Sequence, residues 1–85
     1  ATLSARQMAL TDVYGRLTAL LESLAELQPD GMRSIGERLT HQDIANRIGC
    51  TREMVSRVMR DLETGGHVQQ ERGVISLRSA LPARW

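Results

Sequence analysis

The chain of 85 residues contains no phenylalanine and no lysine, and it has one tyrosine, one tryptophan and one cysteine. With so few aromatic residues, the core of one small domain must be built from Leu, Ile, Val, Met and Ala. The single Cys50 excludes an internal disulfide and fits a reducing compartment. We find neither a signal peptide nor an apolar run long enough to cross a bilayer, so we expect a cytoplasmic protein with no membrane partner.

Residues that carry chemistry are also scarce. Cys50 has no histidine placed to activate it, and Cys50, His41 and His67 do not have the spacing of zinc ligands. The glycine pair at 65 and 66 is not a phosphate-binding loop. We therefore expect that the chain is not an enzyme, holds no metal and binds no cofactor of its own.

Positive charge is concentrated in one part of the chain. The net charge is only +1, which by itself does not indicate a nucleic-acid partner. Residues 32–60, however, hold six arginines against three acidic residues, whereas residues 1–31 hold two arginines against four. Arginine binds guanine and phosphate through paired hydrogen bonds better than lysine does. Genome base composition is the alternative reason for the missing lysine.

The first third of the chain predicts one amphipathic helix. Thr11 or Asp12 can cap it. An apolar stripe then follows at intervals of three and four, in the order Val13, Leu17, Leu20, Leu21, Leu24 and Leu27. Residues 29–31, Pro-Asp-Gly, are expected to end the helix. Residues 3–10 predict a separate helical piece, and residues 32–39 either a small ribbon or an irregular loop.

Residues 40–66 predict two further helices joined by a tight turn. Thr40 caps the first of them, with Asp43 as a partner resembling that of a capping box. Gly49 ends it in the left-handed conformation that a sharp turn needs. Thr51 caps the next helix, which the glycine pair at 65 and 66 stops.

The apolar pattern of these two helices is that of a helix-turn-helix. A steep crossing needs a small residue at the contact, which Ala45 provides, and a glycine four residues later, which is Gly49. The inward positions are apolar: Ile44, Ile48, Val55 and Val58. An ordinary helical hairpin is the alternative. Val68, a polar turn at 69–73 and residues 74–77 then predict a hairpin. The fold class is therefore mainly α with a small β-hairpin, a winged helix-turn-helix.

The outward residues of the last helix suit the major groove of DNA. Arg52 and Arg57 can each pair with guanine O6 and N7, and Glu53 can accept a hydrogen bond from cytosine N4. The alternative for Glu53 is a carboxylate that stabilises the helix N-terminus. The alternative for Arg57 and Arg60 is a solvated face with pairs such as Glu53 with Arg57.

Phosphate contacts are expected beside these base readers. Thr40, His41 and Gln42 lie at a helix N-terminus, where backbone N–H groups attract anions. Arg60, and Arg72 at the hairpin tip, are further candidates. His41 as an exposed polar residue and Arg72 as an ordinary charged turn are the alternatives.

Three stretches resemble the C-terminal DNA-binding domain of the Crp/Fnr (cyclic-AMP receptor protein-like) family of bacterial transcription regulators. They are DVYGRLTALLESLA at 12–25, LTHQDIANRIGCTREMVSRVMRDLE at 39–63 and the hairpin that follows. The resemblance implies a homodimer on a palindromic promoter site, with phosphate contacts from Thr40, Gln42 and Thr51 and with His41 where a basic residue is common.

The resemblance also implies how bases are read. In the cyclic-AMP receptor branch, Arg-Glu-x-x-x-Arg reads TGTGA-like half-sites, and it falls on Arg52, Glu53 and Arg57. In the Fnr branch, Glu-x-x-Ser-Arg reads TTGAT-like half-sites, and it falls on Glu53, Ser56 and Arg57. The chain satisfies both patterns, and Arg52 favours the TGTGA-like site.

The resemblance divides the chain into three parts. Residues 1–11 are expected to be the end of a dimerisation helix and a hinge, residues 12–78 the winged helix-turn-helix domain, and residues 79–85 a C-terminal tail. We expect a DNA-binding domain of a longer protein, whose effector, a cyclic nucleotide or another ligand, binds in an N-terminal domain outside these residues. The loop at 29–38 corresponds to a region that contacts RNA polymerase in some members. The alternative function is a winged-helix protein-interaction module that docks through its apolar N-terminal segment.

Overall fold

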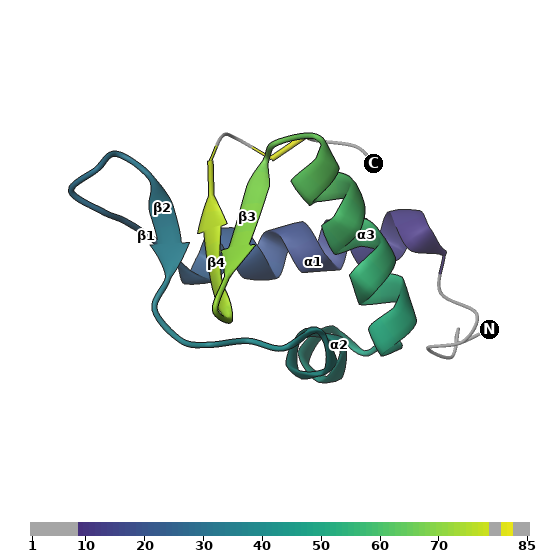
Figure 1. Ribbon diagram of the computed structural model, residues 1–85. Coiled ribbons are helices and arrows are strands. Elements are labelled where there is room, and N and C mark those ends of the chain that lie inside the picture. The colour runs from purple at the N-terminus through teal and green to yellow at the C-terminus, as the bar shows by residue number, and fades with distance from the viewer. Residues whose placement is uncertain (1–8, 79–80, 83–85) are drawn as a thin grey trace.

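The computed structural model describes residues 9–78 and 81–82, and these residues form a winged helix-turn-helix. Three helices pack beside one antiparallel sheet with the strand order β1-β2-β4-β3. In Figure 1, α1 runs behind the sheet and behind α3, and α2 lies below them. The elements in chain order are α1 (Leu10–Leu24), β1 (Ala25–Leu27), β2 (Arg33–Ile35), α2 (His41–Ile48), α3 (Arg52–Thr64), β3 (Val68–Glu71) and β4 (Val74–Leu77).

Helix α1 differs from the prediction at both ends. It begins at Leu10 after Ala9, without a side-chain cap, so the predicted cap at Thr11 or Asp12 is wrong. It ends at Leu24, and the chain continues as β1, which leaves Leu27 74% exposed. The apolar residues continue at intervals of three and four as far as Leu27. This spacing does not reveal that β2 forms backbone hydrogen bonds with residues 25–27.

The segment after α1 forms a hairpin of its own. The turn between β1 and β2 contains Gly31 at φ +88°, and the Met32 N–H donates to the Asp30 carboxylate at 2.9 Å. Strand β2 pairs with β1 on one side and with β4 on the other. Of the two alternatives for residues 32–39, the small ribbon is therefore confirmed, and the hairpin predicted from sequence becomes half of a four-stranded sheet.

The helix-turn-helix itself is built by short-range hydrogen bonds. Thr40 and Asp43 form a complete capping box, with the Asp43 N–H donating to Thr40 Oγ1 at 3.0 Å and the Thr40 N–H donating to Asp43 Oδ2 at 2.9 Å. Gly49 ends α2 in the left-handed region at φ 80°. The Met54 N–H donates to Thr51 Oγ1 at 3.3 Å, so Thr51 caps α3. These predictions are confirmed.

The wing, which we define as strands β3 and β4 with their turn, is longer than expected. The turn between the two strands consists of Arg72 and Gly73, and both residues have positive φ, of 54° and 79°. Two successive positive φ values match the right-handed twist of the flanking strands in a tight hairpin. The prediction of a turn over 69–73 is wrong in extent, because residues 69–71 pair with β4.

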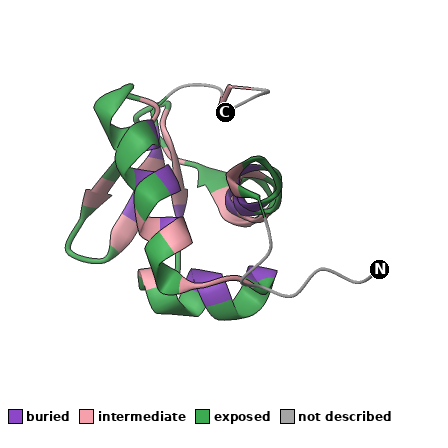
Figure 2. Cartoon of the chain, turned by 90° about the vertical axis from the view of Figure 1, so that its right-hand side faces the viewer, coloured by how far each residue is buried: buried purple, intermediate pink, exposed green. Residues whose placement is uncertain are grey.

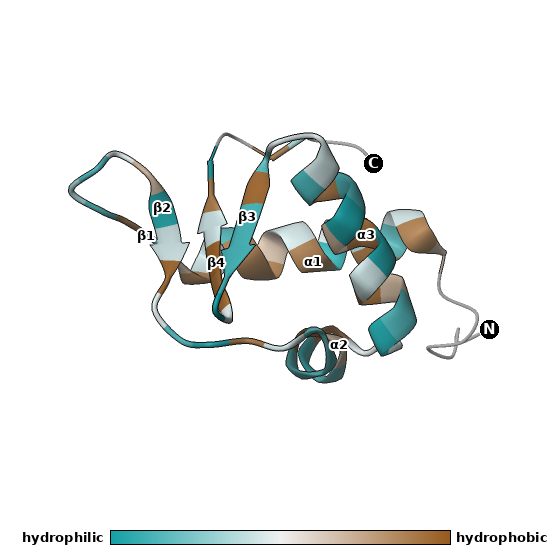
Figure 3. Cartoon of the chain, viewed as in Figure 1, coloured by the Kyte–Doolittle hydropathy of each residue, from teal (hydrophilic) through white to brown (hydrophobic). Residues whose placement is uncertain are grey.

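The core is aliphatic, as predicted. Among the described residues, Tyr14 is the one aromatic side chain in the core; its hydroxyl donates to the Pro82 carbonyl, and burial raises its pKa. The buried stripes of the helices meet the inner face of the sheet (Figure 2), and hydrophilic residues cover most of the outer surface of α2 and α3 (Figure 3). The core comprises Val13, Tyr14, Leu17, Leu21, Ile35, Leu39, Ile44, Ala45, Ile48, Val55, Val58, Met59, Leu62, Val68, Ile75 and Leu77.

Two regions of the expected domain division lie partly outside the described residues. The first is residues 1–11, predicted as the end of a dimerisation helix and a hinge, of which residues 9–11 are described; α1 begins among them, at Leu10. In the C-terminal tail, Leu81 packs against the core and Pro82 accepts the hydrogen bond from Tyr14. No helix in the described part of the chain is long and apolar enough to cross a membrane.

Candidate nucleic-acid interface

The four predicted base readers lie together on the outer face of α3. A shallow hollow along this helix is lined by Arg52, Glu53, Ser56, Arg57, Arg60 and Asp61. The opposite face of the same helix is buried in the core, with Val55 and Val58 fully covered. Because residues three or four apart share a helix face, anchoring the apolar stripe fixes the direction in which the polar residues point.

Arg52 and Glu53, two of the predicted base readers, are exposed at the start of α3 and paired with each other. Arg52 Nη2 lies 3.7 Å from Glu53 Oε1, and the two side chains are 58% and 76% exposed. An exposed pair of this kind stabilises a protein by about 0–1 kcal/mol. Either group can therefore exchange its partner for a base edge at little cost. Arg57 has an interaction partner within the fold.

His41 joins three elements of the candidate interface. It lies in the first turn of α2, and its Nδ1 is 2.8 Å from Ser56 Oγ on α3. Its Nε2 is 3.0 Å from Gln70 Oε1 on β3 of the wing. The sequence suggested an exposed polar residue or a phosphate ligand, whereas the structure gives both ring nitrogens partners within the protein.

Gln70 is a residue of this site that sequence reasoning missed. It lies 29 positions from His41 in the chain. The only feature of the local sequence that points to Gln70 is its position on a strand close to the turn of the wing. Gln69 has the same feature, so the sequence does not distinguish the two. The docking of the wing against α2 and α3 decides which glutamine reaches the histidine.

The helix N-termini keep hydrogen-bond donors available for an anion. Thr40 and Thr51 each accept a backbone N–H through the hydroxyl oxygen, which leaves the hydroxyl hydrogen to donate elsewhere. The backbone N–H groups of His41 and Gln42 open α2 and have no partner within the helix. The side-chain amide of Gln42 donates to Asn46 Oδ1 at 2.9 Å.

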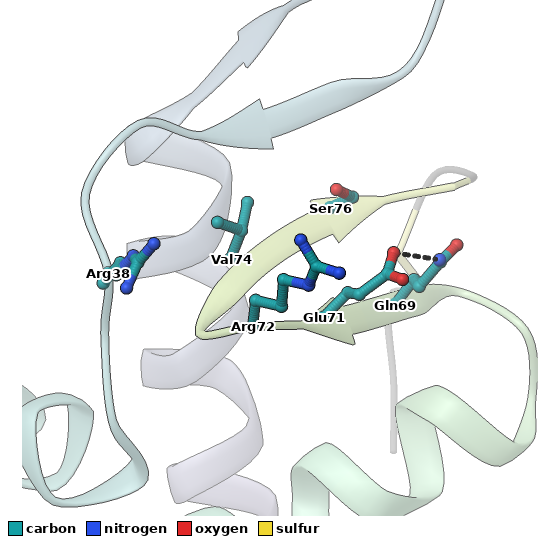
Figure 4. A pocket seen from close by; sticks show the side chains of 6 residues that line it. All are labelled: Arg38, Gln69, Glu71, Arg72, Val74 and Ser76. Atoms are coloured by element: carbon teal, nitrogen blue, oxygen red, sulfur yellow. Dashed lines mark hydrogen bonds between the residues drawn. The ribbon is translucent and has the colours of Figure 1, made fainter.

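A second hollow lies against the wing. It is lined by Arg38, Gln69, Glu71, Arg72, Val74 and Ser76. Figure 4 shows Arg72 lying along the hairpin, with Arg38 apart from it on the segment that leads to α2. The Arg38 side chain also flanks the turn, because a Cβ built at Gly73 would lie 3.6 Å from its Cδ. Arg38 was not among the predicted phosphate contacts. The one sequence feature that points to Arg38 is the excess of arginine within residues 32–60.

Two carboxylates beside the interface, those of Asp43 and Glu37, have hydrogen-bond partners within the protein. Hydrogen bonds from Thr40 lower the pKa of Asp43, and a hydrogen bond from Arg47 lowers the pKa of Glu37. Burial raises the pKa of the Cys50 thiol, which disfavours a reactive thiolate in the turn. Within residues 9–78 and 81–82, no cluster of three or more His, Cys, Asp or Glu is placed to hold a metal ion.

Sequence comparison relates this geometry to known regulators. Residues 15–81 match the model of the Crp-like helix-turn-helix domain. The chain is 39% identical over 66 residues to the cAMP-activated global transcriptional regulator Vfr of Pseudomonas aeruginosa, covering 72% of this chain and 29% of that protein. It is 34% identical over 68 residues to the CRP-like protein Clp of Xanthomonas axonopodis, covering 76% of this chain and 29% of that protein.

Solved structures support the same fold. A CRP/FNR-family transcriptional regulator from Thermus thermophilus superposes with a TM-score of 0.66 at 26% identity, over 79% of this chain and 36% of that chain. The reduced CO-sensing protein from R. rubrum superposes with a TM-score of 0.69 at 24% identity, over 82% of this chain and 33% of that chain.

Vfr and the Thermus thermophilus protein are transcriptional regulators. This chain spans less than a third of the length of the two curated relatives. The family match covers α1 from residue 15 onward, all of α2 and α3, and the complete wing. The chain therefore belongs to the Crp-like helix-turn-helix family, and it carries the winged-helix DNA-binding domain of the Crp/Fnr transcription regulators.

Proposed function

We propose that this domain binds duplex DNA by placing α3 in the major groove, where Arg52, Glu53, Ser56 and Arg57 read bases. One observation carries the proposal: the four side chains share the exposed face of one helix whose opposite face is anchored in the core. The early turns of a recognition helix are the part that reaches base edges in helix-turn-helix proteins. Arg52 and Arg57 each match guanine, and Glu53 matches cytosine.

Phosphate contacts on either side of α3 would hold it in register. We assign them to Thr40, His41, Gln42, Thr51, Arg60 and Arg72. The hydroxyl hydrogens of the two threonines and the open N–H groups of α2 support this assignment. His41 would contribute through its backbone N–H, because both of its ring nitrogens already have protein partners.

The half-site and the assembly follow from the family pattern. We propose a TGTGA-like half-site, because Arg52 completes the Arg-Glu-x-x-x-Arg pattern. Residues 1–11 would end a dimerisation helix, so that two copies bind a palindrome in the cytoplasm.

The parent protein would sense a cyclic nucleotide or another effector outside these residues. RNA polymerase would contact residues 29–38, which include most of the turn of the β1–β2 hairpin and strand β2.

A selection of bound sequences from random duplex DNA tests this function. We expect enrichment of TGTGA-like half-sites and a steep fall of affinity with salt, because arginine contacts release counterions from DNA. Enrichment of TTGAT-like sites would change the half-site and leave the function standing. Binding without enrichment of any sequence would contradict base reading by α3.

A protein-interaction module without direct DNA readout is the second candidate. The exposed Leu27, at the end of β1 beside the turn of the β1–β2 hairpin, favours a protein contact there. The apolar N-terminal segment, which the sequence predicts as the docking face of such a module, lies mostly outside the described residues. A titration of duplex DNA at low and moderate salt separates the two, since a module of this kind would show no salt-dependent DNA binding.

A further inference from the structure

The contact of His41 with Ser56 and Gln70 constrains where hydrogens lie in the interface. A neutral imidazole has one ring nitrogen that donates and one that accepts. The amide oxygen of Gln70 only accepts, and it lies 3.0 Å from His41 Nε2. The Nε2 atom must therefore carry the hydrogen. His41 Nδ1 is then an acceptor.

The hydrogen on the neighbouring serine is fixed as a consequence. Ser56 Oγ lies 2.8 Å from His41 Nδ1, and an accepting nitrogen at this distance requires the hydroxyl to donate. A hydroxyl has one hydrogen and two lone pairs. With its hydrogen committed to His41, Ser56 has only lone pairs left for any further partner.

Ser56 also faces the groove-binding surface. It lines the hollow on α3 together with Glu53 and Arg57, and it is only half-buried. A free serine is an ambiguous base reader, because it can donate to one base and accept from another. A serine that only accepts is selective. In the major groove, adenine N6 and cytosine N4 donate, whereas thymine O4 and guanine O6 accept.

We propose that His41 is a positioning residue that holds Ser56 as a hydrogen-bond acceptor, so that Ser56 selects a base with an amino group, adenine or cytosine. This role rests on the proposed function, because it needs α3 in the major groove. Gln70 lies on β3, so its hydrogen bond with His41 links the wing to His41 and Ser56. The wing thereby influences base choice through His41, in addition to any phosphate contact made by Arg72.

The first experiment needs no DNA. Nitrogen-15 NMR of the imidazole distinguishes the Nε2–H tautomer from the Nδ1–H tautomer. We expect the Nε2–H tautomer for His41 in the wild-type chain and a mixture of tautomers in Gln70→Leu, which removes the acceptor. Gln69→Leu, on the same strand, is the matched control and should keep the wild-type tautomer. A dominant Nδ1–H tautomer in the wild type would overturn the proposal.

The second experiment measures base choice. Duplexes that carry each of the four bases at every position of the selected half-site are titrated with the wild type, Ser56→Ala, His41→Phe and Gln69→Leu. We expect one position where adenine or cytosine is preferred by roughly fivefold, the worth of one net hydrogen bond. Ser56→Ala and His41→Phe should lose this preference, and Gln69→Leu should retain it.

Other outcomes are decisive in different ways. If Ser56→Ala keeps the wild-type preference at every position, the reading role of Ser56 is wrong while the proposed function stands. If the wild type prefers guanine or thymine at the position lost in Ser56→Ala, the acceptor assignment is wrong. If the wild type shows no sequence preference at all, the proposed function fails and this role fails with it, whatever tautomer the NMR experiment finds. Gln70→Leu serves as the second variant if His41→Phe does not fold.

Discussion

The Arg16 guanidinium on α1 donates a hydrogen bond to the backbone carbonyl of Ile48, the last residue of α2, at 3.0 Å. Carbonyl groups at the end of a helix have no partner within it, and they favour a positive charge. Arg16 therefore ties the first helix to the turn of the helix-turn-helix. The bond spans 32 positions of the chain, and no local pattern in the sequence points to it.

Replacing Arg16 should loosen this turn. We expect Arg16→Met to lower the free energy of unfolding by about 1 kcal/mol, because a partly buried charged hydrogen bond and a favourable helix-end charge are both lost. Urea denaturation would show a lower midpoint with an unchanged slope. Arg78→Met, which removes another exposed arginine, is the control. Equal midpoints for the two variants would mean that the contact adds no stability.

A side chain at the turn glycine should destabilise the domain. Gly49 has φ +80°, and an L-residue in the left-handed region is strained by roughly 1–2 kcal/mol. We expect Gly49→Ala to destabilise the domain by about that amount in thermal unfolding. Gly36→Ala is the matched comparison, because a Cβ at Gly36 meets nothing within 4 Å and its φ is not positive. A neutral Gly49→Ala would contradict a conformational role for this glycine.

Two arginines of α3 should differ in what they do for DNA binding. Arg57→Ala should weaken binding to the selected site by about 1–3 kcal/mol and relax the choice at one guanine. Arg60→Ala should weaken binding to all sequences alike and reduce the salt slope by about one. Fluorescence anisotropy with specific and scrambled duplexes at several salt concentrations separates these effects. Equal losses on both duplexes for Arg57→Ala would contradict base reading.

Acid should weaken the contact between α1 and β2. A hydrogen bond from Arg33 lowers the pKa of Glu22 in the folded state. A carboxylate with a lowered folded pKa stabilises the protein above its unfolded pKa, and this contribution disappears as the pH falls through the folded value. We therefore expect the unfolding free energy to fall in that acidic window, and Glu22→Gln to flatten the slope.

The control for this measurement is Glu26→Gln. Within the described residues, the Glu26 carboxylate forms no ion pair. Urea denaturation across the acidic range should give this variant the wild-type slope. If Glu22→Gln also keeps that slope, the contact with Arg33 does not contribute to acid stability.

The elements that follow from local chemistry were predictable. The capping box of Thr40 and Asp43, the left-handed Gly49 and the cap at Thr51 all depend on groups three or four residues apart. The exposed face of α3 followed from the spacing of the apolar residues on its other face. The four candidate base readers share one surface for that reason.

What the tertiary structure decided depends on contacts between distant segments. The periodicity of residues 13–27 continued a helix past Leu24, but pairing with β2 turned residues 25–27 into a strand. Arg16 and His41 likewise look like ordinary polar residues until docking brings them to Ile48, Ser56 and Gln70. The sequence alone determined the helix-turn-helix, because its signals are encoded in neighbouring residues. Only the packed fold determined how α1 and the wing are fastened to it, because those bonds exist once the separate elements have come together.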